Sequence, residues 1–164
     1  MEIKLTNPDY KGYFTITRHA CRGLIIKDDL LLVGYEKNID QYIIPGGGVE
    51  NNETYEECCI REVLEETGIN SRPIKEYLVI EELFGTMKHI NHYFICDYIS
   101  ETDNIHLTES EIKYGLTFKW MKVEDVINIF STYEKYLACD IPRYGLYRRE
   151  FLALKEYLKL TNLG

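Results

Sequence analysis

Residues 45–69 read Pro45-Gly-Gly-Gly-Val-Glu-Asn-Asn-Glu-Thr-Tyr-Glu-Glu-Cys-Cys-Ile-Arg-Glu-Val-Leu-Glu-Glu-Thr-Gly-Ile69, a run of glycines followed by a stretch rich in glutamate. Thr54 and Glu57 have the spacing of a capping box, in which each side chain accepts a hydrogen bond from a backbone amide at the start of a helix. Gly68 stands where a left-handed residue commonly ends a helix. The pattern therefore predicts a helix from Tyr55 to Thr67, directly after a glycine turn.

Three glutamates of this predicted helix share one face. At about 100° per residue, Glu62, Glu65 and Glu66 fall within one arc of roughly 100°. The side chains that we expect to pack against the rest of the protein lie on the other side of the helix: Ile60, Val63, Leu64 and Thr67. One face is thus predicted to pack and the other to present three carboxylates.

Carboxylates held this close repel one another unless protons or cations neutralise them. Ligand sets made only of oxygen suit hard divalent ions such as Mg2+ or Mn2+, so a metal site is one interpretation of Glu62, Glu65 and Glu66. The alternative is a solvated acidic helix face, because glutamate is a favourable residue on exposed helices. Charge alone favours the solvated face, and the adjacent glycine turn favours the metal site.

The segment resembles the Nudix box, whose pattern is Gly, five residues, Glu, seven residues, then Arg-Glu-apolar-any-Glu-Glu-any-Gly-apolar. Gly47 opens the pattern, Glu53 follows after five residues, and residues 61–69 supply the rest at the required spacing. The resemblance is to MutT-like members of the Nudix hydrolase family, with the substrate subfamily unassigned. It implies an α+β fold, with a mixed β-sheet core sandwiched between helices, and a single Nudix hydrolase domain over residues 1–164.

The resemblance also implies a reaction and a set of site residues. Nudix hydrolases split a nucleoside diphosphate linked to a group X into a nucleoside monophosphate and X-phosphate, with Mg2+ or Mn2+ as the cofactor. Carried over by position, the expected metal ligands are the Gly46 carbonyl and the side chains of Glu62, Glu65 and Glu66. Arg61 and Glu53 match an ion pair that braces the loop against the helix. The general base varies within the family, and it stays open here.

The substrate is the least determined part of this expectation. Outside residues 45–69 we find none of the subfamily markers of enzymes for ADP-ribose, dinucleoside polyphosphates or NADH. A (d)NTP or modified nucleotide pyrophosphatase is therefore the leading hypothesis. The alternatives are a pyrophosphatase for nucleotide sugars or ADP-ribose, and a non-catalytic Nudix-fold module that binds nucleotides.

Composition limits which partners the protein is expected to bind and in which compartment it is expected to work. A length of 164 residues with 45% hydrophobic content suits one buried core. The net charge of −8 argues against stable nucleic-acid binding, which needs clustered Lys and Arg. Five cysteines without a Cys-x-x-Cys pair indicate reduced thiols, with Cys59 expected in the core, and the sequence shows neither a signal peptide nor an apolar run near roughly 18 residues. We expect a cytoplasmic protein that binds a small nucleotide, has no membrane attachment, and forms a homodimer as one possibility.

The remaining chain alternates strand and helix patterns. Apolar and β-branched residues predict strands at 14–27, 30–35, 41–44, 74–83, 88–100 and 116–121, and helices at 123–130 and within the last 35 residues. Tyr147, Phe151, Leu154 and Leu158 have helical spacing in that last segment. Pro73 is expected to interrupt the chain before the fourth strand, and residues 101–113 to form a polar loop.

Several candidates for the site lie outside the box. Arg18, His19 and Arg22 occur on the first long strand, where either a phosphate or base contact or simple exposure to solvent is consistent with the pattern. His89 and His92 invite a ligand or base hypothesis, although imidazole is not required by a hard cation.

Two acidic candidates come later in the chain. Family members often carry a further catalytic or metal-binding glutamate before the last strand. Glu109 and Glu111 are the candidates for that role, and the sequence alone does not choose between them.

Overall fold

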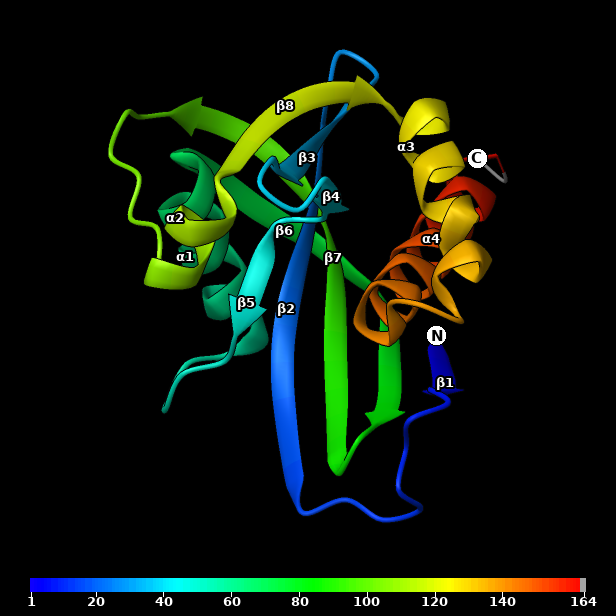
Figure 1. Ribbon diagram of the computed structural model, residues 1–164. Helices are drawn as coiled ribbons and strands as arrows, with labels where there is room; N and C mark the ends of the chain where they lie inside the picture. Colours follow the sequence, from blue (N-terminus) through cyan, green and yellow to red (C-terminus); the bar gives the residue numbers. More distant parts are fainter. Residues whose placement is uncertain (163–164) are drawn as a thin grey trace.

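The computed structural model describes residues 1–162 as one mixed sheet with helices on both sides (Figure 1). The strands are β1 (Glu2–Thr6), β2 (Ile16–Lys27), β3 (Leu30–Glu36), β4 (Gln41–Ile43), β5 (Gly46–Gly48), β6 (Ile69–Phe84), β7 (Met87–Glu101) and β8 (Leu116–Lys122). The helices are α1 (Tyr55–Thr67), α2 (Glu109–Tyr114), α3 (Val123–Phe130), the 3-10 helix η1 (Ser131–Tyr136) and α4 (Ile141–Asn162).

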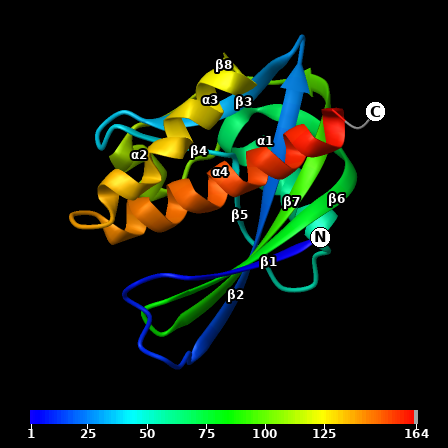
Figure 2. The ribbon, with the colours of Figure 1, turned by 90° about the vertical axis from the view of Figure 1, so that its right-hand side faces the viewer.

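The sheet has the order β1-β6-β7-β2-β3-β4, with β5 added to β2 and β8 added to β3. β1 pairs with β6 and β2 pairs with β7 in parallel, whereas the other pairs are antiparallel. Helix α1 covers one face of the sheet, and α3 and α4 cover the other (Figures 1 and 2). The predicted fold class, a mixed sheet between helices, is confirmed.

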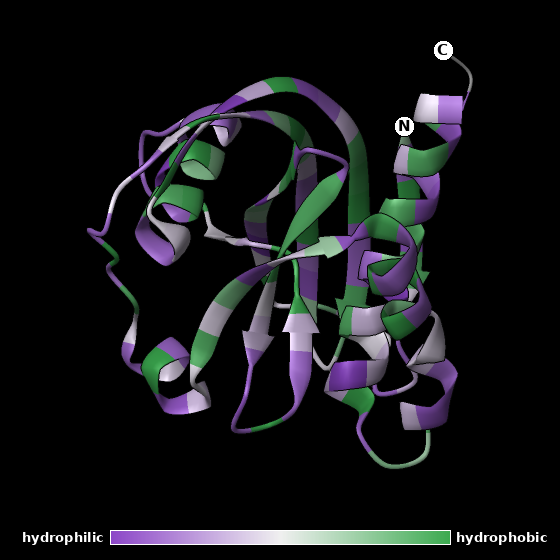
Figure 3. Cartoon of the chain, turned by 90° about the horizontal axis from the view of Figure 1, so that it is seen from above, coloured by the Kyte–Doolittle hydropathy of each residue, from purple (hydrophilic) through white to green (hydrophobic). Residues whose placement is uncertain are grey.

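Two hydrophobic clusters fill the two faces. Successive residues of a strand point to opposite faces, so Leu24 of β2 belongs to one cluster and Ile25 to the other. The cluster under α3 and α4 includes Tyr93, Phe130, Tyr147 and Leu154. The cluster under α1 includes Cys21, Cys59, Val63 and Phe94, and Cys59 is buried as expected. Figure 3 shows hydrophobic residues both along the strands of the sheet and on the helices that cover it.

Helix α1 begins and ends at the predicted residues. The Thr54 hydroxyl accepts a hydrogen bond from the Glu57 amide at 3.2 Å, and a Glu57 carboxylate oxygen accepts one from the Thr54 amide at 2.7 Å. Gly68 closes the helix in the left-handed conformation with φ of 74°. Local capping therefore defines this helix, and these interactions involve residues close in sequence.

The packed face of α1 differs from the prediction. Ile60 is 38% exposed, whereas Glu66 is only 7% exposed. The side chains that contact the sheet are Cys59 and Val63, with Glu66 beside them, because the helix lies with its glutamate edge toward the glycine turn and β2. The carboxylates of Glu62 and Glu66 thus lie against the glycine strand, and the assignment of Ile60 to the packed face was wrong.

Two boundaries also differ from the prediction. Pro73 does not interrupt the chain, because β6 starts at Ile69 and the β6–β7 register shifts between Pro73 and Lys75, which accommodates a residue without an amide proton. The expected polar loop of 101–113 contains the start of α2. Thr108 and Glu111 form a second capping box, the same sequence signal as Thr54 and Glu57.

The C-terminal segment forms the single helix α4, as the spacing predicted. Tyr147 and Leu154 are buried in the core, and Phe151 packs against it. Within residues 1–162, no helix combines the length and apolar character needed to cross a membrane.

Candidate active site

The glycine strand β5 brings the backbone directly under the carboxylates of α1. Gly46 to Gly48 pair antiparallel with Arg22 to Ala20 of β2. Gly46 has φ of 149°, and a Cβ there would overlap the carbonyl oxygen of Cys21. A Cβ at Gly47 would overlap the carboxylate of Glu62. These two positions require glycine, so that the Glu62 carboxylate can lie over the turn.

Two of the three carboxylates are largely removed from solvent, those of Glu62 and Glu66. Burial raises the pKa of Glu62, and the nearby Arg61 guanidinium opposes that shift. Burial also raises the pKa of Glu66 well above its ordinary value, against the opposing effects of a 3.0 Å hydrogen bond from the Gly46 amide and of the positive Arg22. Burial disfavours a charged carboxylate, so each of these two groups is stabilised by a proton or by a cation.

Arg61 braces the loop against the helix. Its Nη2 donates to Oε1 of Glu53 at 2.6 Å and its Nε donates to Oε2 at 2.9 Å, a two-bond pairing. Nη2 also donates to the carbonyl of Gly48 at 3.0 Å. The hydrogen bonds from Arg61 lower the pKa of Glu53 to about 2. Glu53 is therefore charged at neutral pH and committed to this pairing.

The remaining donor of Arg61 faces the other glutamates. Nη1 lies 2.8 Å from Glu62 and 3.3 Å from Glu65, whose side chain is 42% exposed. As the side chains stand in residues 1–162, no three His, Cys, Asp or Glu side chains are grouped as a metal site. Nη1 occupies the space between Glu62 and Glu65, while Nε and Nη2 carry the bonds to Glu53. The oxygen donors still fit Mg2+ or Mn2+, because the buried carboxylates and the carbonyl of Gly46 are ligands that hard cations prefer.

Two arginines of β2 approach the same glycine strand. Arg22 donates from Nη1 to the Gly46 carbonyl at 3.1 Å, and its buried Nε has no hydrogen-bond partner. The Arg18 guanidinium lies beside Gly48, with Nη2 at 2.8 Å from the position of a Cβ on that residue. Both cations thus stand next to the turn that faces the carboxylates.

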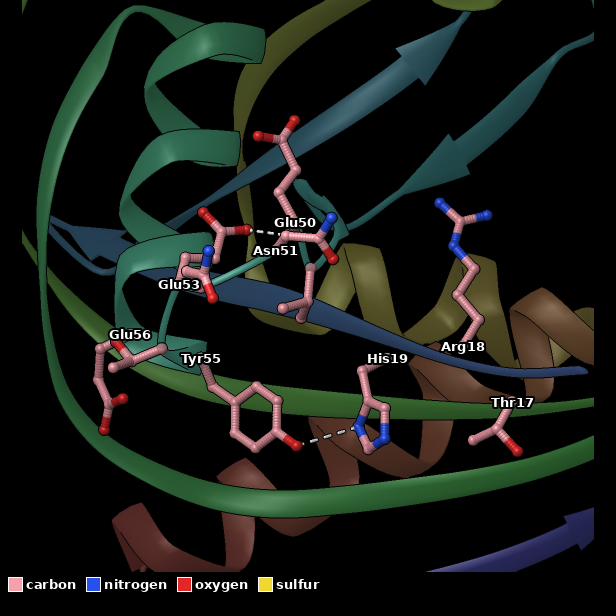
Figure 4. Close-up of a pocket in the computed structure, with 11 residues that line it drawn as sticks. Thr17, Arg18, His19, Glu50, Asn51, Glu53, Tyr55 and Glu56 are labelled. Carbon is pink, nitrogen blue, oxygen red and sulfur yellow. Dashed lines mark hydrogen bonds between the residues drawn. The ribbon is translucent and has the colours of Figure 1, made fainter.

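A wide depression of about 690 Å3 opens beside the N-terminus of α1 (Figure 4). Two of its lining residues are in contact, because the Tyr55 hydroxyl lies 3.2 Å from Nδ1 of His19, and that nitrogen lies 3.0 Å from Nε2 of His92. Nδ1 of His92 in turn lies 3.1 Å from the Glu76 carboxylate, and burial lowers the pKa of His92. Both ring nitrogens of His92 are therefore engaged with protein groups.

A family model described as the NUDIX domain matches residues 17–138. The chain belongs to the Nudix family. It is accordingly a phosphoanhydride hydrolase, as residues 45–69 indicated.

Proteins similar to this Nudix chain include enzymes of human and mouse. It is 31% identical over 156 residues to the diphosphoinositol polyphosphate phosphohydrolase NUDT4B of Homo sapiens, covering 95% of this chain and 75% of that protein. It is 29% identical over 138 residues to the diphosphoinositol polyphosphate phosphohydrolase 3-alpha of Mus musculus, covering 84% and 71%.

Solved structures share the fold of this Nudix chain. A Nudix hydrolase from Nitrosomonas europaea matches with a TM-score of 0.58 and 21% identity over 67% of this chain and 75% of that one. The ORF135 protein of E. coli matches with a TM-score of 0.55 and 18% identity over 88% and 93%. At these identities the likeness concerns the fold alone.

The acidic candidates of the later chain lie on α2 of this Nudix fold. Glu111 uses a carboxylate oxygen to accept the Thr108 amide hydrogen bond at 2.7 Å, and Glu109 is exposed in the first turn. The negative charge of Glu111 contributes to the raised pKa of both Glu66 and Glu36, so Glu111 lies close enough to both to disfavour their charged forms.

Glu36 is an acidic group that the sequence analysis missed. It is 8% exposed at the end of β3, burial raises its pKa, and it accepts a hydrogen bond from Gln41 at 2.7 Å. The only available signal was a single charged residue at the end of an apolar strand.

Proposed function

We propose that this Nudix enzyme hydrolyses a nucleoside diphosphate linked to a group X, giving a nucleoside monophosphate and X-phosphate. The substrate of this proposal is a (d)NTP or a modified nucleotide, and the cofactor is Mg2+ or Mn2+. The observation that supports it is the burial of Glu62 and Glu66 against Gly46 and Gly47, with raised pKa values that a bound cation would offset. Because residues 45–69 also match every fixed position of the Nudix box, a solvated acidic helix face is the weaker interpretation of the three glutamates.

The proposed cation ligands are the carboxylates of Glu62, Glu65 and Glu66 and the carbonyl of Gly46. That carbonyl accepts one hydrogen bond from Arg22, and a carbonyl oxygen has a second lone pair. When bound, a divalent ion neutralises phosphate oxygens and makes a water more acidic. Arg61 holds the loop in place through its hydrogen bonds to Glu53, and so keeps the ligands in position. It can do so even when Nη1 moves out from between Glu62 and Glu65.

Other residues bind and position the substrate. The unpartnered Nε of Arg22 and the guanidinium of Arg18 are placed to donate to phosphate oxygens beside the glycine turn. The candidates to accept the proton of the attacking water are the carboxylates of Glu62, Glu65 and Glu66 and those of Glu109 and Glu111 on α2. Single Glu→Gln variants with full pH profiles distinguish them, since loss of the base removes the acidic limb of the profile.

The test is a hydrolysis panel with Mg2+ and with Mn2+. The substrates are the four dNTPs, 8-oxo-dGTP, ADP-ribose and UDP-glucose, with phosphate and pyrophosphate measured separately. We expect nucleoside triphosphates to release pyrophosphate, EDTA to abolish turnover, and added Mg2+ or Mn2+ but not Ca2+ to restore it. In H2-18O one label should enter only one product. Turnover that survives exhaustive chelation would contradict the proposal.

A second candidate is the hydrolysis of a diphosphoinositol polyphosphate, the activity named for the relatives described above. It uses the same phosphoanhydride chemistry on a far more anionic substrate. Adding a diphosphoinositol pentakisphosphate to the panel separates the two. Turnover of that compound, together with inert nucleotides, would replace our proposal by this one.

We also propose that residues 1–164 act as a single Nudix domain, because both hydrophobic clusters are built on the same sheet. A homodimer remains a prediction, and light scattering coupled to size-exclusion chromatography tests it.

A further inference from the structure

A charged network is buried between the sheet and α4. Arg149 donates to Glu82 at 2.9 Å, to Glu150 at 2.8 Å and to the hydroxyl of Tyr93 at 2.9 Å. All four side chains are buried: Arg149 is 5% exposed, Glu82 2%, and Glu150 and Tyr93 0%. Tyr93 also donates to Glu150 at 3.2 Å and Asn91 donates to Glu82 at 3.5 Å. Because two carboxylates share one guanidinium, the network has an excess of negative charge. Such burial is costly unless further groups complete it.

A cavity of about 200 Å3 opens next to this network. Glu82 and Arg149 reach it from one side, His89 and Phe84 line it from the β6–β7 hairpin, and Pro142 closes it from the start of α4. Nε2 of His89 is buried without a hydrogen-bond partner, in a residue that is 9% exposed. Burial lowers the pKa of His89 to about 2, so the ring is neutral and has one donor and one acceptor nitrogen.

A buried polar atom without a partner costs folding free energy, and such an atom lining a cavity indicates a ligand that completes it. Asn91, next along the same face of β7, is 0% exposed, and its Oδ1 also has no partner. The cavity is smaller than the roughly 300 to 1,000 Å3 typical of whole small-molecule sites. It therefore suits one ring of a larger substrate.

The cavity lies on the same face of the sheet as the arginines of β2. In the β2–β7 register, His89 is opposite Arg18 and Tyr93 is opposite Arg22. Arg22 is in turn paired with Gly46 of β5. Gly46 lies two strand spacings across and four residues along the sheet from His89, roughly 16 Å in all. Arg18 is much nearer, because it is directly opposite His89, about 5 Å away on the next strand, and its guanidinium reaches Gly48. A ribose 5′-phosphate can bridge from the cavity to that guanidinium, which connects the cavity to the proposed phosphate site.

We propose that this cavity binds the nucleobase of the substrate and selects guanine, an inference that rests on the proposed function. Glu82 offers carboxylate acceptors to the ring N–H and the 2-amino group of guanine, and His89 and Arg149 offer donors to its carbonyl oxygen. Phe84 and His89 lie edge to face at 6.2 Å and supply an aromatic wall. The negative charges of Glu82, Glu150 and Asp9 repel phosphate groups, so the cavity disfavours a phosphorylated ring such as that of a diphosphoinositol polyphosphate.

The test is calorimetric binding of GMP and IMP to the full chain in EDTA. IMP differs from GMP only by the missing 2-amino group. We expect GMP to bind about 10- to 100-fold more tightly, the effect of one hydrogen bond to a charged group. Glu82→Gln should abolish this preference. Glu81→Gln is the matched control, because Glu81 is adjacent on β6 and pairs with Lys88 instead.

Equal affinity for GMP and IMP, or a preference that persists in Glu82→Gln, would overturn the inference. If Glu82→Gln does not fold, His89→Leu takes its place, because Nε2 of His89 has no bond to lose within the fold. His89→Leu should weaken GMP binding about 10-fold, and unchanged binding overturns the inference. These binding results are independent of turnover. Nucleotide hydrolysis without a preference for GMP refutes the base site alone, and a preference for GMP without nucleotide hydrolysis refutes the proposed function alone.

Discussion

Replacing Gly47 by Ala should inactivate the enzyme while leaving it folded. The new Cβ would lie closer than 3.0 Å to the carboxylate of Glu62, a separation that real Cβ atoms do not show. The backbone at Gly47 is outside the left-handed region, so alanine adds no conformational strain of its own. The clash is with the end of a flexible side chain, and Glu62 must therefore turn away from the glycine strand.

The two consequences differ in size. Turning Glu62 away breaks its 2.8 Å contact with Arg61 and costs about 1 kcal/mol of unfolding free energy, since the pair is partly exposed. Turnover should fall about 100-fold or more, the scale seen when one charge-stabilising group leaves an active site. Urea unfolding measures the first, and pyrophosphate release with saturating Mg2+ measures the second.

The double variant with Glu62→Ala is the matched control. If Gly47→Ala acts only by displacing this carboxylate, adding it to Glu62→Ala should cause little further loss of turnover. Near-parental activity of Gly47→Ala would refute the placement of Glu62 over the turn. A double variant far less active than Glu62→Ala would show that the methyl group disturbs more than Glu62.

Four further variants test the pairing of Arg61 with Glu53, the exposed carboxylate of Glu65 and the buried His89. Arg61→Ala should lower the unfolding free energy by about 2 kcal/mol as well as turnover, and a parental melting temperature would contradict the bracing role. The pKa of Glu53 is lowered from 4.5 to about 2 in the folded protein. The ionised carboxylate therefore adds its full contribution to the unfolding free energy above pH 4.5, and this contribution is lost as the pH falls toward 2. Glu53→Gln should make the unfolding free energy depend less on pH in that range. Glu65→Gln should melt at an unchanged or higher temperature without metal but lose about 100-fold in turnover, and near-full activity would remove Glu65 from the site. The pKa of His89 is lowered from 6.5 to about 2, so only the unfolded state takes up its proton between these values. Stability should then fall by about 1.4 kcal/mol per pH unit below 6.5 from this group, a slope that His89→Asn should remove in urea titrations.

Local signals in the sequence were sufficient for helix α1 and the family. The capping box joins Thr54 to Glu57, three residues away, and the cap at Gly68 bonds to Leu64, four residues away. Both interactions are local, so their geometry follows from the order of the residues. The same reasoning would have found α2, because Thr108 and Glu111 repeat the pattern. Six strands were predicted with ends that differ by up to five residues, since alternation marks a strand better than its boundaries, whereas the short strand β5 was predicted as a turn.

Only the tertiary structure decided how these elements use their side chains. Helical periodicity predicted that Glu62, Glu65 and Glu66 share one face of α1, but it did not predict which way that face points. The contact between α1 and β5 buries Glu66 and leaves Ile60 exposed. Glu82, His89 and Arg149 meet at one cavity although the last is 60 residues beyond the second. No local pattern relates such positions, because sheet register and the placement of α4 bring them together through packing over the whole core.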